Sequence, residues 1–244
     1  MQFYIGLHQP RLAKSFQRCF ISVNILKQRV SDFEVQDWIM DSGAFTELAR
    51  HGAFTFPVDE YARAIERWAG CGNLEMAVTQ DYMCEPFMLE RTGMAAREHQ
   101  ELTIRRYDQL LRLSPVPIMP VLQGYQPEEY ITHLGMYGAR LTEGMRVGVG
   151  SICKRNSNPR AIVDVLHGIK RERPDLRLHG FGLKTTALHN AYIVSLLHSA
   201  DSMAWSYAAR REGRDPNGLA EATGFRDKVQ IGLARKSHQL EFVA

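Results

Sequence analysis

Short apolar segments alternate along the chain with longer segments in which apolar residues recur every three to four positions. Eight of the short segments are rich in Ile, Val and Phe, which is typical of buried β-strands. They span residues 3–7, 20–23, 38–41, 76–80, 118–122, 147–150, 178–182 and 202–205. The longer segments predict helices over residues 57–69, 90–113, 126–131, 158–166, 186–198 and 224–240. Asn158 is expected to cap its helix, since a side-chain oxygen there accepts from the first free N–H groups.

Strands that alternate with helices predict parallel pairing through crossover helices. Eight such units within 244 residues favour one domain, residues 1–244, folded as a closed (β/α)8 barrel. An open doubly wound sheet is the alternative. That fold normally has a glycine-rich phosphate loop after its first strand, whereas His8-Gln-Pro-Arg follows here.

Composition narrows the class of protein. The chain is 45% hydrophobic and 23% charged, which is ordinary for a globular protein with a large core. No apolar stretch approaches the about 18 residues of a membrane helix. The first residues lack the basic start and apolar middle of a secretion signal, so a cytoplasmic protein without a membrane partner is expected. The four cysteines contain no CxxC pair and predict neither a zinc cluster nor a disulfide framework.

The net charge of +3 is unremarkable, but basic residues cluster at 154–155, 170–173, 210–214 and 235–236. Clusters of this kind can follow a phosphate backbone, although each one alone is more typical of a solvated helix end. We take Lys154, Arg155, Arg210 and Arg211 as candidate contacts to a nucleic-acid backbone.

Carboxylates recur at the ends of predicted strands. Asp41, Asp81 and Asp201 each follow or end a short apolar run, and Gln123 ends another. In a (β/α)8 barrel the C-terminal strand ends share one face and build the active site. The sequence therefore predicts an active site that works through carboxylate chemistry.

Three neighbouring strand ends carry groups that match the edge of a purine. Asp81 accepts hydrogen bonds, Gln123 both donates and accepts, and the amide of Gly150 donates. Tyr82 or Met83 would pack on the face of the ring. Together they predict a binding site for a planar heterocycle with N–H donors.

Asp201 is the candidate nucleophile, because a carboxylate can attack an anomeric carbon and hold a covalent glycosyl intermediate. Asp41 would move a proton to and from the leaving base, and Ser42 and Gly43 would bind a polar substrate group. The alternative for Asp201 is an ion pair with a nearby arginine. The histidines match no metal-ligand spacing, so no metal is expected, and His179 is a candidate substrate contact.

In this order, the segments resemble those of the tRNA-guanine transglycosylase superfamily, (β/α)8 barrels that exchange guanine for a 7-deazaguanine without breaking the strand. The resemblance covers about residues 38–214. It implies that Asp41 transfers protons, that Asp201 is the nucleophile and that Arg210 contacts phosphate. It also implies a base site, formed by Asp81, Gln123-Gly124, Gly150 and the segment that begins at His179.

The departures from that superfamily concern the substrate. Ala44 replaces a glycine, Thr46 stands where glutamine is usual, and no Cys-x-Cys-x-x-Cys zinc motif is present, so tRNA is the less favoured substrate. The compact, zinc-less form is similar to the DpdA-type DNA 7-deazaguanine transglycosylases of phages and bacterial modification islands. Residues 3–10 and 21–24 also resemble that branch, in its short phage form.

The resemblance implies exchange of guanine in DNA for preQ0 or a related base, through a covalent Asp–C1′ intermediate. DNA and the free base would be the partners, no cofactor or zinc would be needed, and a homodimer is compatible with the sequence. The alternatives are an enzyme acting on tRNA, a carboxylate-dependent nucleoside or glycoside hydrolase, and a non-catalytic nucleic-acid-binding subunit. The presence of both Asp41 and Asp201 argues against the last of these.

Overall fold

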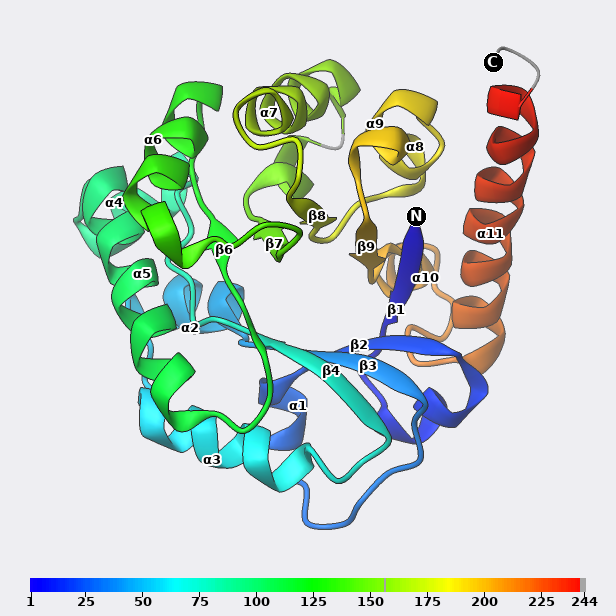
Figure 1. Cartoon of the computed structure of the whole chain (residues 1–244). Coiled ribbons are helices and arrows are strands. Elements are labelled where there is room, and N and C mark those ends of the chain that lie inside the picture. Colours follow the sequence, from blue (N-terminus) through cyan, green and yellow to red (C-terminus); the bar gives the residue numbers. More distant parts are fainter. Residues whose placement is uncertain (156, 242–244) are drawn as a thin grey trace.

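The computed structural model describes residues 1–155 and 157–241, and its strands form a nearly closed barrel (Figure 1). The strands are β1 (Gln2–Gly6), β2 (Arg18–Ser22), β3 (Asp37–Asp41), β4 (Asn73–Val78), β5 (Ile118–Met119), β6 (Val121–Leu122), β7 (Arg146–Val149), β8 (Arg177–Gly180) and β9 (Ser199–Ser202). All their pairings are parallel, and β9 pairs with β1. The predicted α/β barrel is confirmed.

Pro120 divides the fifth predicted strand into β5 and β6. Because proline has no N–H group, it cannot donate to a neighbouring strand. β5 pairs with β4 and β6 pairs with β7. β5 and β6 are the two ends of the nine-stranded order, and they follow each other in the chain. Counted together as one interrupted strand, they give a barrel of eight strand positions.

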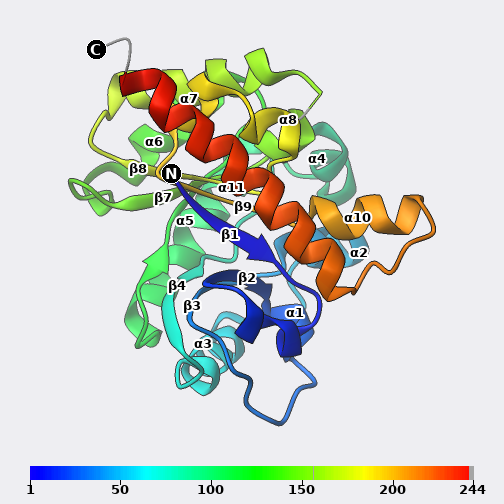
Figure 2. The same ribbon diagram turned by 90° about the vertical axis from the view of Figure 1, so that its right-hand side faces the viewer.

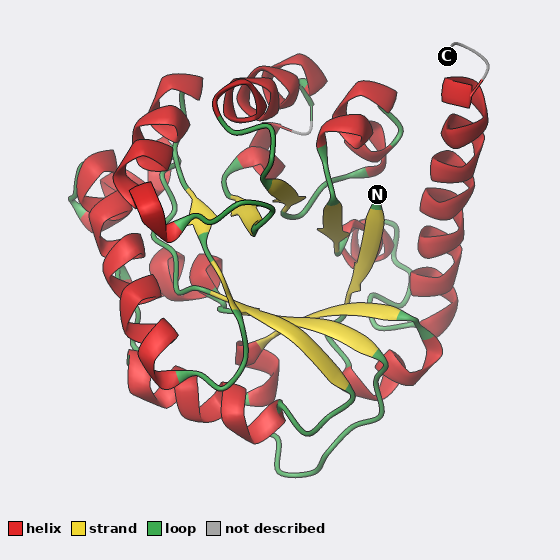
Figure 3. Ribbon diagram, in the orientation of Figure 1, coloured by secondary structure: helices red, strands yellow, loops and turns green. Residues whose placement is uncertain are grey.

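Helices surround the strands on the outside (Figure 3). They are α1 (Val23–Leu26), α2 (Ala44–His51), α3 (Val58–Trp68), α4 (Pro86–Thr92), α5 (Ala96–Leu113), α6 (Pro127–Tyr137), α7 (Pro159–Glu172), α8 (Thr185–Leu188), α9 (Ala191–Leu196), α10 (Ala204–Arg211) and α11 (Leu219–Glu241). Asn158 caps α7 as predicted, accepting from the Ala161 N–H. None of the helices in the described part of the chain is long and apolar enough to cross a membrane.

Three predicted boundaries are wrong for local reasons. The helix expected over 90–113 is divided at Gly93, whose φ of +69° ends α4 in a conformation that glycine adopts readily. The strand expected over 202–205 lies earlier, at Ser199–Ser202, and residues from Ala204 onward form α10. Pairing of Phe3 with Ala200 and of Tyr4 with Asp201 fixes its register. Asp201 therefore lies within β9, near its C-terminal end, and does not precede the strand as the predicted bounds implied.

The helix expected over 186–198 is likewise two short helices, α8 and α9. Asn190 lies between them, and its side chain accepts from the N–H groups of Tyr192 and Ile193. An Asn side chain that caps a new helix competes with continuation of the old one. The break is therefore a capping event within an otherwise helical pattern.

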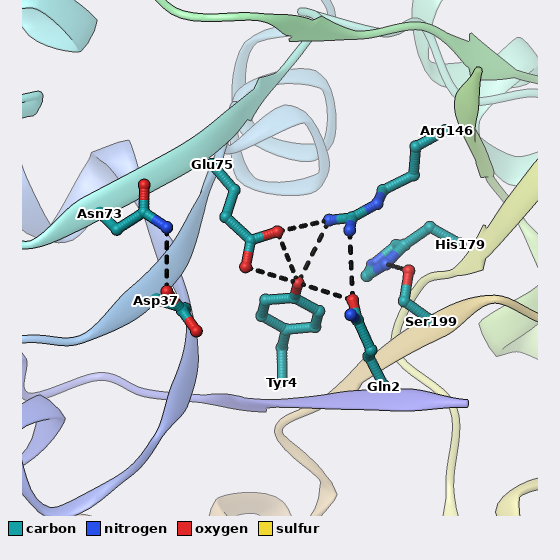
Figure 4. A network of polar contacts seen from close by, with 8 residues as sticks. All are labelled: Gln2, Tyr4, Asp37, Asn73, Glu75, Arg146, His179 and Ser199. Carbon is teal, nitrogen blue, oxygen red and sulfur yellow. Dashed lines mark hydrogen bonds and ion pairs between the residues drawn. The ribbon is translucent and has the colours of Figure 1, made fainter. Parts of the chain in front are cut away.

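The N-terminal end of the barrel is filled by a polar network (Figure 4). Arg146 donates to Glu75 at 2.8 Å, and the Tyr4 hydroxyl donates to the same carboxylate at 2.8 Å. Burial raises the pKa of Tyr4 to about 12, so its hydroxyl remains a donor. Gln2 accepts from Arg146 at 3.2 Å. These polar groups are hydrogen bonded to one another. We therefore expect a binding site at the opposite, C-terminal end of the barrel.

Candidate active site

A cavity of about 400 Å³ lies at the C-terminal end of the barrel. This size falls within the range of small-molecule sites, roughly 300–1,000 Å³. Its lining comes from His8, Phe20, Ser22, Asn24, Ile25, Asp41, Gly43, Ala44, Phe45, Thr46, Val78, Asp81, Met83, Gln123, Gly150, Ser151, Cys153, Lys154, Phe181, Gly182, Asp201 and Met203. The three aspartates predicted from strand ends therefore meet around one cavity.

Asp81, Gln123 and Ser151 form a chain of hydrogen bonds along one wall. The Gln123 Nε2 donates to Asp81 Oδ2 in a short contact, and the Ser151 hydroxyl donates to Gln123 Oε1 at 2.9 Å. Ser42 approaches the other Asp81 oxygen at 3.4 Å. These bonds fix which end of the Gln123 amide faces Asp81. A ligand with both donors and acceptors on one edge could replace them.

The carboxyl groups of Asp81 and Asp41 hold protons more tightly than usual. Burial raises the pKa of Asp81 to about 7; Gln123 opposes the shift, while the charges of Asp41 and Glu85 add to it. Burial also raises the pKa of Asp41 to about 6, against a hydrogen bond from Ser22 and with the charge of Asp201. Carboxyl groups poised near neutral pH are suited to proton transfer.

Among the described residues, the Asp201 carboxylate is held through its Oδ1 oxygen. Its Oδ1 accepts from the Gly182 N–H at 3.1 Å and lies 3.3 Å from His179 Nε2. The other ring nitrogen, Nδ1, lies 2.9 Å from the Ser199 hydroxyl. If Ser199 donates to Nδ1, the proton is on Nε2 and points at the carboxylate, the tautomer that this geometry favours. No hydrogen bond among the described residues uses Oδ2, so that oxygen can contact a ligand in the cavity.

Several predicted site residues support the cavity without lining it. His179 is buried behind Asp201 and stacks on Phe20, with ring centroids 5.7 Å apart. Ser42 is buried behind Asp81. Gly124 packs against α6, where a Cβ atom would come within 3.0 Å of Tyr130. These three residues position or accommodate their neighbours.

The predicted roles of Tyr82 and Gly150 need correction. The Tyr82 ring packs between Phe54 and His99 and is not part of the cavity lining, whereas Met83 is. The Gly150 N–H already donates to the Leu122 carbonyl at 2.9 Å within the barrel, so it is not available to a base. Glycine still matters there, because a Cβ atom would overlap the Gln123 amide and displace that side chain.

The predicted backbone contacts occupy different settings. Lys154 lines the cavity, and Arg210 and Arg211 are exposed on α10. Burial and, to a smaller extent, the charge of Arg210 lower the pKa of His8. Since His8 lines the cavity, Arg210 lies near the cavity rim. Arg155 instead packs over the Tyr125 ring at 4.5 Å, with two of its nitrogens buried. The side chains of residues 235–236 lie outside the described part of the chain.

Sequence reasoning missed the contribution of β2 and the segment after it. Ser22 hydrogen bonds to Asp41, and the Asn24 amide donates to the Gly43 carbonyl at 3.3 Å. A signal was present, because these polar residues follow a strand just as Asp41 does. They could have been found by applying the strand-end rule to the second strand, and His8 by applying it to the first.

The raised pKa of Asp81 gives a prediction about stability. A carboxyl group with a higher pKa in the folded protein contributes stability that is full below its unfolded pKa of about 4 and is lost as the pH rises through about 7. Asp81→Asn lacks this titration. We expect the free energy of unfolding of the variant, minus that of the wild type, to rise between pH 4 and pH 8 by on the order of 2–4 kcal/mol. Urea denaturation at several pH values measures it.

Asp59 supplies the control for that measurement. It is exposed, and a hydrogen bond from Arg63 lowers its pKa below the usual range near 4. Because this group is ionised in both the folded and the unfolded protein above pH 4, Asp59→Asn should show almost no change in the same difference between pH 4 and pH 8. Parallel pH curves for Asp81→Asn and the wild type would contradict the prediction.

Comparison with known families completes the description of the site. A family model described as "DpdA: DeoxyPurine in DNA protein A" matches residues 1–224. No curated protein matches the chain. The matched range contains all nine strands and every residue that lines the cavity.

Proposed function

The chain belongs to the DpdA family, DeoxyPurine in DNA protein A, and from this we propose that it replaces guanine in DNA by a 7-deazaguanine such as preQ0. The observation that carries the proposal is the meeting of Asp41, Asp81 and Asp201 around one cavity. A base-exchange enzyme needs a nucleophile, a proton carrier and a base-reading group, and the three carboxylates can divide these roles.

In this proposal Asp81 and Gln123 read the base. Guanine presents its N1–H and 2-amino group on one edge, and a carboxylate accepts from both. The same edge is present in a 7-deazaguanine, which differs only at position 7. One site can therefore hold the leaving base and then the incoming base. Asp81 must give up its contact with Gln123 or share it with the ligand.

Asp201 attacks C1′ of the target nucleotide through Oδ2, and the bond from C1′ to guanine N9 breaks. The resulting ester links the DNA sugar to the enzyme, and a second displacement by the incoming base restores the original configuration. Asp41 in its acid form gives a proton to departing N9. The ionised Asp41 then takes the N9 proton of the incoming base, so the protons balance over the cycle.

A base stacked in a duplex cannot reach a cavity at the end of a barrel. The target nucleotide must turn out of the stack or come from single-stranded DNA. Lys154, Arg210 and Arg211 would contact the phosphates on either side. Binding that rests on such contacts weakens as salt rises.

The test is exchange of labelled guanine against added preQ0 in double-stranded DNA, single-stranded DNA and tRNA. We expect incorporation into DNA and none into tRNA, and none into any substrate with Asp201→Asn. Incorporation into tRNA alone would overturn the substrate while keeping the mechanism. Release of guanine without incorporation would identify a hydrolase instead.

A further inference from the structure

Two aromatic rings are exposed at the rim of the cavity. Phe45 on α2 is 48% exposed and lines the cavity mouth, and Phe87 on α4 is 44% exposed and lies outside it. Their ring centroids are 6.5 Å apart with an interplanar angle of 64°. Both helices lie on the side of the molecule to which the β1 arrowhead points (Figure 2). Fully apolar rings at such a position present an open stacking surface.

A cation accompanies this Phe45–Phe87 pair. The ammonium of Lys154 lies 4.3 Å from the Phe45 ring centroid and 5.4 Å from that of Phe87. Lys154 comes from a third segment, the short 3-10 helix Ile152–Arg155 after β7. Among the described residues no acidic side chain forms an ion pair with it. Its charge acts on the buried Glu85, where it opposes the rise that burial causes in the pKa, but no ion pair holds its ammonium away from an anion beside the rings.

The same combination recurs on α10, which follows the strand that carries Asp201. Tyr207 is 56% exposed, with Lys184 5.9 Å and Arg211 6.0 Å from its ring. Exposed rings beside cations are the pattern with which proteins bind unpaired nucleic acid, because bases stack on the rings and phosphates meet the cations. The charge and the rings at this rim are thus complementary to a DNA strand.

We propose that the Phe45–Phe87 pair is a stacking platform for the nucleotide next to the target deoxyguanosine, with Lys154 at the phosphate between them. The inference rests on the proposed function, since it requires a base to leave the stack. When that base turns into the cavity, its neighbour loses a stacking partner. Phe87 lies just outside the cavity, so its ring is placed to stack on the neighbour and not on the target base.

The test uses Phe87→Ala and a fluorescein-labelled single-stranded oligonucleotide with one deoxyguanosine, without free base. All proteins compared for binding, including the one with wild-type Phe87, also carry Asp201→Asn, so that no covalent adduct forms. We expect the dissociation constant for DNA to rise on the order of tenfold, the typical effect of losing one stacked base, and Phe87→Trp to retain binding. The KM for preQ0 should stay unchanged. Tyr192→Ala on α9, 50% exposed, is the matched control, and it should bind DNA like the wild type.

A second oligonucleotide, abasic at the neighbouring position on either side in turn, makes the test specific. If the ring stacks on that base, the wild type loses about tenfold on one of the two abasic strands, and Phe87→Ala loses nothing further there. The platform would be overturned if the losses of affinity from Phe87→Ala and from the abasic site were independent and additive. It would also be overturned if Phe87→Ala bound DNA as tightly as the wild type, or if the protein did not bind DNA. Here coupling means that the abasic site and Phe87→Ala do not weaken binding additively. Because binding is measured without exchange, coupling together with no exchange by the protein that retains Asp201 would keep the platform and reject the proposed reaction. Exchange without coupling would do the reverse.

Discussion

Asp201→Asn should lower the exchange rate by at least about 10³-fold, as expected when a covalent nucleophile is removed, and should leave the fold intact. The amide oxygen can still accept from the Gly182 N–H and face His179, as Asp201 Oδ1 does. The amide nitrogen would replace Oδ2, the oxygen proposed to attack, and it is a poor nucleophile. The expected loss is therefore in the bond-forming step and not in binding.

Single-turnover exchange and trapping of the covalent adduct measure this loss. Labelled DNA that migrates with the wild-type protein on a denaturing gel should be absent with Asp201→Asn, while the DNA dissociation constant changes little. Asp164→Asn, on the exposed side of α7, is the matched control and should form the adduct normally. Near-wild-type exchange by Asp201→Asn would remove Asp201 from the mechanism.

The parts of the site that sequence could predict are those set by topology. In a parallel barrel every strand ends at the same face, so Asp41, Asp81, Gln123 and Asp201 could be grouped without knowing any contact. Their convergence at one cavity follows from the alternation of strands and helices alone. The strand near Asp201 was misplaced because Ser199–Ser202 has no large apolar residue, and its position depends on pairing with β1.

The sequence could not predict roles that depend on the direction of a side chain past a strand end, on strand register or on hydrogen bonds between side chains. Tyr82 lies past the last residue of β4, Val78, so strand alternation no longer tells which way its ring points. The Gly150 N–H is taken by Leu122, which depends on the register between β6 and β7. His179 was expected to touch substrate because it precedes a glycine-rich strand end, but its ring bonds to Ser199 and Asp201.

Features that join distant segments were also hidden. Phe45, Phe87 and Lys154 belong to three separate loops and helices, and no spacing along the chain relates them. The preceding strands β3 and β4 are neighbours, but β7 pairs with β6 and β8, so strand order alone does not bring Lys154 to the two rings. Sequence alone therefore indicated the candidate catalytic carboxylates, and the structure was needed to find the surface around them.

Asp41→Asn should lower kcat by about 10²–10⁴-fold, the usual effect of removing a general acid–base group, and should also remove a pH dependence. In the wild type the pKa of Asp41 is about 6. Release of guanine needs the acid form, so this half-reaction should slow as the pH rises above about 6. Capture of the incoming base needs the ionised form, so this second half-reaction should slow as the pH falls. Its midpoint should lie below about 6, because the ester removes the Asp201 charge that raises the pKa of Asp41 in the free protein.

The two half-reactions can be separated in time. Guanine release is measured in a single turnover without free base, and incorporation is measured by adding preQ0 to the adduct. Opposite slopes in the wild type, both lost in Asp41→Asn, would identify one carboxyl group that acts in both directions. If the variant kept both slopes, another group would carry the proton.

Ionisation of Asp81, whose pKa is about 7, should act on the KM for the base, because a protonated Asp81 accepts fewer hydrogen bonds. Overall exchange cannot be faster than the slower of the two half-reactions. Its rate should therefore be highest at the pH where the rate of guanine release, which falls with pH, equals the rate of base incorporation, which rises with pH.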